Sequence, residues 1–473
     1  MSEAVSKEAA KARLQRMNVV LGLCAGLAGG AVRSLCLDAS LPHGLLIGAG
    51  FGIFFALFLM PRATSPGAGL IWGVSTAFLL WMLPQIGESF LKFGVESSLP
   101  MLQDVRQRFP ELVADLVCLG LPVGVLLGLR GAGQNENAGP PFRWWRAIVA
   151  GGFTGVVSGL IFGYWMLAGD FFPLLAGLGE FHSRTMAVAA QFGVALAIGA
   201  TFGLLFQHDV HGYGSCMGWG VGYTMLWWFA GPLFLFPLVR HAPLNWSADH
   251  ASDLFGPLVG HILYGLILGV SYATFDRIWV RLFIQSDPLN RQPEGPGLRI
   301  IRSLQWGIAA GLAGGVVSSP VMIATGMLPR AHYALAGGLV VHLLVSALIG
   351  MNFGLLFRDE ASNIGVGIGW GWLFGLMWWY AGAMTLLPLL STGEIDWRPS
   401  TAGSLLPSAV GHLIYGGVTA FVFLAIERQF SRRSRGVPGT RKPQADASIP
   451  YSPAPALWMF VLGLGILLPV LLG

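Results

Sequence analysis

A long stretch of this chain occurs twice in register, and this recurrence defines the structural unit. The motif Phe-Gly-Leu-Leu-Phe at 202–206 returns at 353–357, which is 151 residues later. The same spacing relates Trp219 to Trp370, the tryptophan pair at 227–228 to the pair at 378–379, and the Gly-His pair at 260–261 to that at 411–412. Because a repeated unit constrains an architecture before any single motif does, we expect copies of one module.

The copies consist of segments suited to a membrane. Hydrophobic residues make up 54% of the 473 residues and charged residues 11%, whereas soluble domains are about 25% charged. A membrane-spanning helix needs about 20 apolar residues. Thirteen stretches qualify, at 18–38, 41–60, 66–86, 111–130, 147–169, 185–206, 213–238, 257–276, 305–328, 334–357, 364–390, 406–426 and 456–473. The sequence therefore predicts an all-α, polytopic transmembrane helix bundle.

Lysine and arginine are concentrated in four segments. These segments, before the first span and after the fourth, eighth and twelfth, hold 18 of the 28 basic residues. If successive spans alternate in direction, all four segments lie on one side, and the positive-inside rule makes that side the cytoplasm. We expect a multi-pass protein of the bacterial inner membrane with a cytoplasmic N-terminus and an extracytoplasmic C-terminus. The lipid bilayer is then its partner, and the short basic loops do not indicate nucleic acid.

The basic segments divide the chain into three modules of four spans each. The sequences of module 2 (144–283) and module 3 (303–431) match each other best, whereas the sequence of module 1 (18–131) is divergent. Ala-Gly-Leu-Ala-Gly-Gly at 25–30 nevertheless returns at 310–315. Four spans per module give all three the same direction, so the modules are parallel repeats.

Three segments lie outside the modules, and two features within the modules also carry predictions. The outside segments are a cytoplasmic N-terminal segment (1–17), a flexible cytoplasmic linker (432–455) rich in Pro, Ser and charge, and an additional C-terminal span (456–473) that other membrane subunits could dock on. The region 88–110 predicts an amphipathic surface helix. In each tryptophan pair, we expect one ring to pack inside and the other to face lipid or the membrane interface.

One ionisable position per module is the sharpest functional candidate. Asp115, His261 and His412 occupy equivalent places in the fourth spans, and Tyr264 and Tyr415 follow their histidines by three residues on the same helical face. An ionisable residue inside a span is a functional hypothesis, with a proton or a substrate as its target. The alternative is a side chain hydrogen-bonded to a neighbouring helix. A third interpretation is a haem ligated by both histidines.

Three more polar residues lie within spans. His342 in module 3 stands where module 2 has Gln191, and an interhelical hydrogen bond is the expected role of each. Arg33 aligns with Ser158 and Ser318. Its side chain either extends to the membrane interface or lines a cavity.

The sequence holds little that indicates chemistry. The four cysteines show no C-x-x-C spacing and lie in or beside apolar segments, which favours buried small hydrophobes. We find no nucleophile–base pair, metal-ligand cluster or nucleotide motif, so we expect neither an enzyme nor a metal site. The polar start of the chain is too long for a cleavable signal peptide.

The first spans (Ala-Gly-x-x-x-Gly-x-Val) and fourth spans (His-Ile-Leu-Tyr-Gly at 261–265, His-Leu-Ile-Tyr-Gly at 412–416) give a family resemblance. This pattern resembles the YagU-like four-span bacterial membrane proteins of unknown function. Module 1 departs from it, with Asp115 and Cys118 in place of His and Tyr. The resemblance implies an integral inner-membrane protein of three fused modules, and it brings no reaction.

Three functions remain open. The first is an accessory or scaffold subunit of a membrane complex, which few intramembrane charges and much Gly-Trp packing favour. The second is a small-solute or ion transporter or channel with a pathway lined by Arg33, Asp115, His261 and His412. The third is a haem-binding redox subunit.

Overall fold

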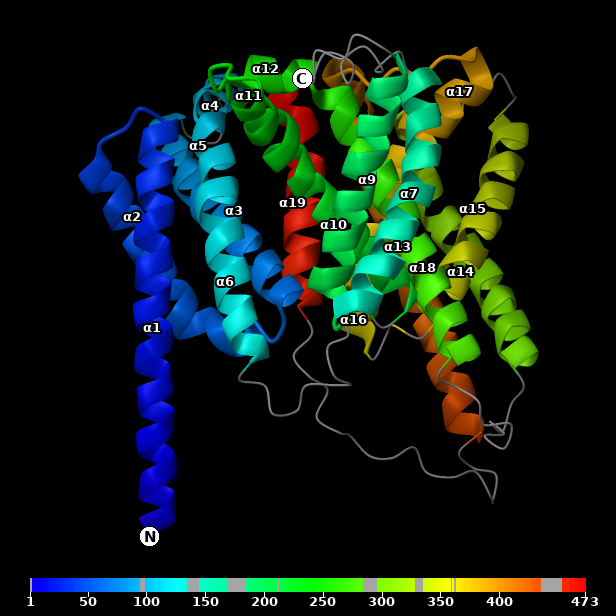
Figure 1. The fold of residues 1–473 in the computed structure, drawn as a ribbon. Helices are drawn as coiled ribbons and strands as arrows, with labels where there is room; N and C mark the ends of the chain where they lie inside the picture. The colour runs from blue at the N-terminus through cyan, green and yellow to red at the C-terminus, as the bar shows by residue number, and fades with distance from the viewer. Residues whose placement is uncertain are drawn as a thin grey trace.

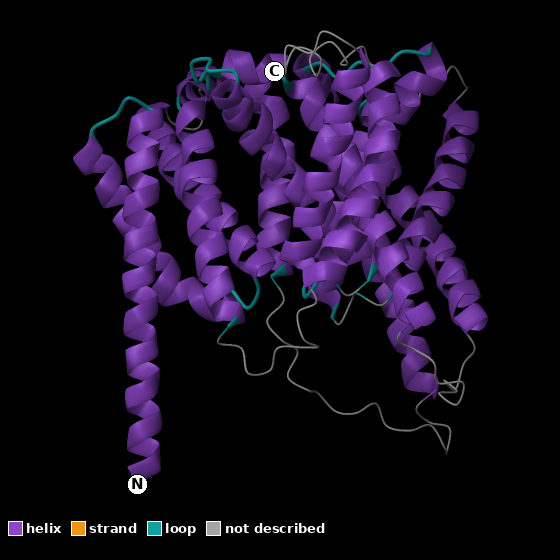
Figure 2. Cartoon of the chain, viewed as in Figure 1, coloured by secondary structure: helices purple, strands orange, loops and turns teal. Residues whose placement is uncertain are grey.

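The chain is an all-α bundle. The computed structural model describes residues 2–93, 98–133, 144–168, 184–210, 212–283, 296–327, 335–358, 360, 363–434 and 453–473. These residues form helices joined by short loops and hold no strand (Figure 2). Thirteen helical segments among them are long and apolar enough to cross a membrane. The predicted fold class is confirmed, whereas most of the linker at 432–455 lies outside the described residues.

The segments predicted as three modules each contain four long apolar helical segments, with shorter helices between them that differ from one module to the next. Module 1 has α1 (Ser2–Cys36), α2 (Leu41–Phe54), η1 (Phe55–Leu59), η2 (Met60–Arg62), α3 (Pro66–Phe93), α4 (Ser98–Gln107), α5 (Phe109–Ala114), η3 (Asp115–Gly120) and α6 (Leu121–Ala132). Module 2 has α7 (Trp144–Ala168), α9 (Arg184–Phe206), α10 (Tyr213–Ala230), η4 (Gly231–Leu235), α11 (Phe236–Val239), α12 (Ala248–Asp253) and α13 (Phe255–Phe283). Module 3 has α14 (Pro296–Ala324), α15 (Leu335–Phe357), α16 (Ile364–Trp378), η6 (Trp379–Leu386), α17 (Leu387–Thr392) and α18 (Pro399–Ser434), and α19 (Ala454–Leu472) follows.

Local sequence explains where several helices begin and end. The side chain of Asn363 accepts a hydrogen bond from the amide of Val366 and caps α16, while Ser65 accepts from the amide of Ala68 and caps α3. α17 ends at Gly393, whose φ of 77° is the left-handed conformation that terminates helices.

Helices pair in the same way within each module. The first helix packs along the second (α1 on α2, α7 on α9, α14 on α15), and the third packs along the fourth (α3 on α6, α10 on α13, α16 on α18). Glycines permit this proximity: a Cβ added to Gly151 would overlap the carbonyl of Gly199, and one on Gly371 would overlap that of Gly416. Close backbone approach of this kind is the usual basis of helix association in lipid.

In each tryptophan pair one ring packs inside, as the sequence predicts. Trp228 and Trp379 are fully buried, and their indole N–H groups donate to the carbonyls of Leu254 (2.9 Å) and Leu405 (3.2 Å) at equivalent positions. Their partners at 227 and 378 are partly exposed. In module 1, Trp81 makes the corresponding bond to the carbonyl at position 108 (3.1 Å).

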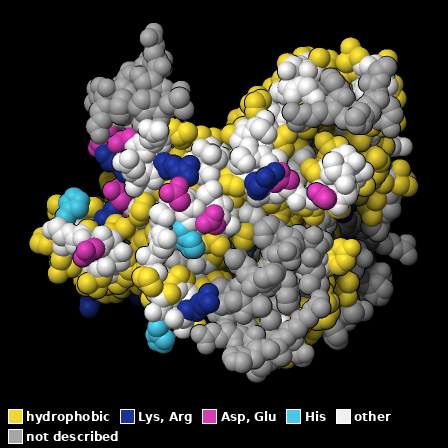
Figure 3. Space-filling view, turned by 90° about the horizontal axis from the view of Figure 1, so that it is seen from above, with side chains coloured by type: hydrophobic (Ala, Val, Ile, Leu, Met, Phe, Trp, Pro, Cys, Tyr) yellow, Lys and Arg dark blue, Asp and Glu magenta, His cyan; other side chains and the backbone are white. Residues whose placement is uncertain are grey.

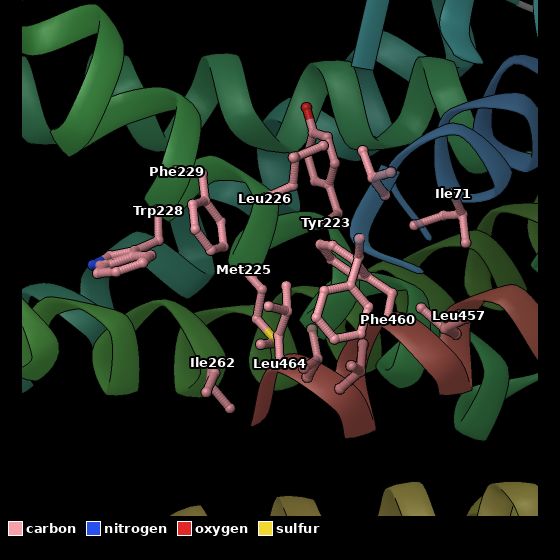
Figure 4. Packing of buried hydrophobic residues seen from close by; sticks show 14 of the residues in the cluster. Ile71, Tyr223, Met225, Leu226, Trp228, Phe229, Ile262, Leu457, Phe460 and Leu464 are labelled. Atoms are coloured by element: carbon pink, nitrogen blue, oxygen red, sulfur yellow. The ribbon is translucent and has the colours of Figure 1, made fainter. Parts of the chain in front are cut away.

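α19 occupies the middle of the bundle (Figure 1). It packs against the third helix of every module (α3, α10 and α16) and also against α18. Its Leu457, Phe460 and Leu464 are fully buried, and Figure 4 shows them close to Ile71 of α3 and Met225 of α10. The centre of the three-module arrangement is therefore filled by apolar side chains.

Side chains from all three modules also bond to the backbone of α19. Ser75 of α3 donates to the carbonyl of Ala456 (2.7 Å), Ser252 of α12 to that of Leu472 (2.8 Å), and Tyr380 of η6 to that of Gly465 (2.8 Å). Along α19 only Pro455 is exposed. The expectation that this span is a docking element for other subunits stays a prediction, and most of the surface of the span is used inside the chain.

Apolar and charged side chains separate over the outside of the molecule. Seen from above, acidic and basic side chains lie among the loops of the end face and hydrophobic ones form the rim (Figure 3). The second helices are among the outermost: Leu344 on α15 is 62% exposed. This distribution suits a bundle with a polar end face and lipid around its sides.

Two predicted segments differ in detail from the structure. The polar stretch at 1–17 does not form a separate segment, because from Ser2 it is the first part of α1. In the region 88–110, α3 continues to Phe93 and the separate helix α4 begins at Ser98. Arg106 of α4 donates to the carbonyl of Leu471 (3.1 Å), so α4 packs on the end of α19.

Candidate functional site

The two charged candidates of module 1 form a buried ion pair. Nε of Arg33 donates to Oδ1 of Asp115 at 2.6 Å, with the side chains 7% and 14% exposed. Arg33 comes from the last turn of α1, and Asp115 is the first residue of the π-helical segment η3. Arg33 therefore does not stand alone in a cavity, because its charge is neutralised by Asp115 on the neighbouring helical segment.

A pair of thiols lies next to this ion pair. Cys36 and Cys118 hydrogen-bond to one another between α1 and η3, within the electrostatic range of Asp115. Cys118 stands where the other modules have their tyrosine. Module 1 thus replaces the His and Tyr of the other modules with an ion pair and a thiol pair, both joining its first helix to its fourth.

In module 2, His261 and Tyr264 share a face, as the spacing predicts. The ring of Phe162 on α7 lies 6.0 Å from that of His261 and 5.6 Å from that of Tyr264. Nδ1 of His261 lies 2.8 Å from the carbonyl of Pro257, one turn back on the same helix. The hydroxyl of Tyr264 donates to the carbonyl of Ala195 on α9 (3.1 Å). The tyrosine therefore joins the fourth helix to the second.

Module 3 repeats these contacts at equivalent positions. Nδ1 of His412 lies 2.9 Å from the carbonyl of Ser408, and the hydroxyl of Tyr415 donates to the carbonyl of Ser346 on α15 (2.6 Å). A hydrogen bond from His Nδ1–H to a carbonyl leaves Nε2 as the acceptor. Both histidines thus have a hydrogen bond at Nδ1 within their own helix, and this is not the bond to a neighbouring helix that the sequence interpretation offered.

Of the two remaining polar residues, His342 makes the hydrogen bond that the sequence predicts. Nε2 of His342 lies 3.1 Å from the carbonyl of Gly315 on α14, which is the predicted interhelical hydrogen bond. His342 is also an electrostatic neighbour of His412. Gln191 is buried at the corresponding position of α9.

The four proposed pathway residues fall into three separate places. Arg33 and Asp115 meet in module 1, His261 contacts α7 of module 2, and His412 contacts its own helix and His342 in module 3. Each set faces helices of its own module, and α19 fills the space between the modules. A haem held by the two histidines would need both imidazoles to face one space, and their contacts lie in different modules.

The sequence interpretation missed two carboxylates that join the modules. Asp209, after α9, accepts a hydrogen bond from Ser65 at the start of α3 (2.6 Å). Glu360, after α15, accepts from the amide and the hydroxyl of Ser215 at the start of α10 (3.0 and 2.8 Å). These acids are 151 residues apart and each follows the repeated Phe-Gly-Leu-Leu-Phe motif by three residues, so extending that motif would have revealed them.

Asp209 lies in a loop outside the spans, in a poorly solvated place. Burial raises the pKa of its carboxyl to about 7, and the hydrogen bond from Ser65 partly opposes this rise. A carboxyl in this state changes its protonation near neutral pH, at a contact between two modules.

Comparison with protein families, with curated proteins and with solved structures gives no match to this chain. The described residues contain no group of three or more His, Cys, Asp or Glu side chains placed to hold a metal ion. Function must therefore be inferred from the arrangement of the helices.

Proposed function

We propose that the chain is a scaffold or accessory subunit of a membrane complex, without catalysis of its own. Its place is the bacterial inner membrane, with the N-terminus in the cytoplasm and the C-terminus outside. The resemblance to YagU-like membrane proteins agrees with this proposal and adds no reaction to it.

The observation that carries the proposal is the position of α19. A channel or carrier built from three parallel modules would place its pathway where the modules meet. Here Leu457, Phe460 and Leu464 fill that place and are fully buried against the third helices. Side chains from all three modules bond to the same helix. Such an arrangement favours a rigid core over a solute pathway.

The state of the intramembrane polar groups supports the same conclusion. The charges of Arg33 and Asp115 neutralise one another, and both tyrosine hydroxyls donate to backbone carbonyls. Groups that handle protons or solutes in membranes are usually connected with one another or with a cavity. These groups instead join helices within single modules.

Purification from native membranes tests the proposal. A stoichiometric partner is expected to copurify in mild detergent, and the protein alone in liposomes is expected to move no solute. If no partner appears, while the reconstituted protein transports a solute and His412→Ala stops that transport, the scaffold proposal is wrong.

One observation favours a second candidate, passage of an ion through module 1. The Arg33–Asp115 pair stands at the start of a π-helical segment, and such segments are frequent at functional sites. In this alternative, Asp115→Asn abolishes ion flux into liposomes while the protein remains folded. In the scaffold proposal the wild type and the variant show the same background flux.

A further inference from the structure

The junctions between modules follow one plan, in which the second helix of a module ends against the third helix of the module before it. At the first junction Phe206, the last residue of α9, fills the space over Gly67 of α3. At the second, Phe357, the last residue of α15, fills the space over Gly214 of α10. Both rings are fully buried. Each glycine is the second residue of its helix. We call the space over this glycine the socket of the third helix, and it lies at the same position in both helices.

A carboxylate completes each of these junctions. Asp209 and Glu360 each follow their phenylalanine by three residues and bond to Ser65 and Ser215, at the start of the third helix that holds the socket. The N-terminus of a helix favours negative charge because its free amides and its dipole are positive there. A junction therefore consists of a helix end with the pattern Phe-x-x-acid, a glycine that leaves space for the phenylalanine ring, and a serine at the start of the third helix that donates to the acid.

The third socket, in module 3, is open. A Cβ added to Gly365 of α16 would meet only Oδ1 of Asn363, at 3.5 Å. Gly365 is exposed, Ile368 above it is half-buried, and Trp372 on the same face is 47% exposed. The counterparts of the last two are buried in both other modules: Leu70 and Val74 in α3, and Met217 and Val221 in α10.

The same face of module 3 remains open on α18. Val410 is 52% exposed, whereas its counterparts Val113 and Val259 are fully buried. The indole nitrogen of Trp372 would lie 2.9 Å from a Cβ added to Gly417 of α18, so the faces of the two helices adjoin. We define the open face by Gly365, Ile368, Trp372 and Val410.

α19 covers the part of module 3 that corresponds to the part of module 2 covered by α16. In this respect α19 takes the place that the third helix of a further module would have. In module 2, Gly218 receives the ring of Trp370 from the next module; in module 3, Gly369 receives the ring of Trp458 from α19. The two tryptophans touch at 5.4 Å between ring centroids. α19 thus replaces a following third helix, whereas the described part of the chain holds no counterpart of a following second helix.

A second copy of this chain lacks the chemistry to fill the open face. The second helices of modules 2 and 3 are already used at the two junctions. The corresponding end in module 1 has Leu59 in place of phenylalanine and Arg62 in place of the acid. An arginine brought to the N-terminus of α16 would meet the positive end of the helix dipole. Among the described residues, α2 and α16 make no contact as extensive as α3 with α9 or α10 with α15.

We propose that the open face docks a membrane-spanning helix of another protein, whose end beside Gly365 carries Phe followed three residues later by Asp or Glu. The proposal rests on the scaffold function and names the place where the scaffold holds its partner. Lipid alone is the competing occupant. Trp372 lies eight residues into α16, about 12 Å along the axis, which is deeper than the interface where exposed tryptophans usually lie.

A peptide of known sequence tests the open face directly. The probe is a fluorescent synthetic peptide of residues 184–209, which carries the Phe206–Asp209 end, titrated against the full chain in mixed micelles. The blocking variant is Gly365→Leu, because the position is open and the added side chain fills the socket. The matched control is Gly193→Leu, an exposed glycine of α9 with equally open surroundings. Gly365→Leu is expected to weaken binding at least ten-fold and Gly193→Leu to leave it unchanged.

The peptide and the chain itself supply two further controls. A peptide with Asp209→Lys is expected to bind at least five-fold more weakly than the original, because a lysine would meet the positive N-terminal end of the α16 dipole, where an acid is favoured. Equal binding to both glycine variants, or no binding to the wild type, overturns the proposal. Self-association of the full chain that Gly365→Leu abolishes would assign the face to a second copy and also overturn it.

Crosslinking in native membranes identifies the occupant. A photo-crosslinker at Ile368 is expected to capture a different protein at a transmembrane end with the Phe-x-x-acid pattern, while one at the lipid-facing Leu344 captures none. Capture of lipid alone at Ile368 refutes this docking site. The scaffold function survives that result if a partner still copurifies, so the two proposals can fail independently.

Discussion

Exchanging the Arg33–Asp115 pair for the residues of the other modules measures what the pair does. Modules 2 and 3 have serine and histidine at these positions, so the test variants are Arg33→Ser, Asp115→His and the double exchange. Each single exchange leaves a charge unpaired at a site where the side chains are 7% and 14% exposed. Removing one member of a buried ion pair costs about 3–5 kcal/mol, whereas replacing both members is often close to neutral.

Unfolding in mixed micelles, followed by tryptophan fluorescence, gives the three free energies. We expect each single variant to lose about 3–5 kcal/mol and the double variant much less than the sum of the two losses. The control is Arg398→Ser, which breaks the exposed pair with Asp396 and is expected to change stability little because water screens that pair. A double variant as unstable as the two singles together would refute a role of mutual neutralisation.

Three further predictions follow from the packing. Phe460→Ala in α19 is expected to cost about 3–5 kcal/mol in the same unfolding assay, and Leu344→Ala on the lipid face close to nothing. Tyr264→Phe and Tyr415→Phe are expected to lose similar amounts, about 0.6–1.7 kcal/mol each, and a loss confined to one would contradict their equivalence. Burial raises the pKa of Asp209 from 3.8 to about 7, so its stabilising contribution is present below pH 3.8 and lost as the pH rises through about 7. Asp209→Asn is expected to flatten the fall in stability across this range, and an unchanged pH profile would contradict the assignment.

Much of the fold follows from the sequence because the repeats act as an internal control. The recurrence at 151 residues predicts the equivalence of Tyr264 and Tyr415, and both hydroxyls bond to a second-helix carbonyl at matching positions. Apolar length predicts the helices themselves. Their starts are less well predicted, because a polar stretch such as the beginning of α1 can continue a helix outside the apolar segment.

The position of α19 does not follow from its sequence. A helix that is apolar on every side suits the lipid-facing surface and the centre of a bundle equally well, so composition does not separate the two. The pairing of Arg33 with Asp115 spans 82 residues and depends on how α1 meets η3. The sequence did hold a signal for this pair. In modules 2 and 3 the position equivalent to Arg33 is a serine and the position equivalent to Asp115 is a histidine, so module 1 gains both charges together. The junction acids Asp209 and Glu360 were also visible as a continuation of the repeat.

The accessibility of position 460 to water shows whether α19 fills the centre of the bundle. The four native cysteines are replaced, Phe460→Cys or Glu394→Cys is introduced, and a water-soluble maleimide is added to the protein in nanodiscs. Glu394 lies in an exposed loop and reports full labelling. Position 460 is expected to stay unlabelled in the folded protein and to react after denaturation. Labelling of position 460 as fast as position 394 would mean that water reaches the centre, and a pathway would replace the scaffold.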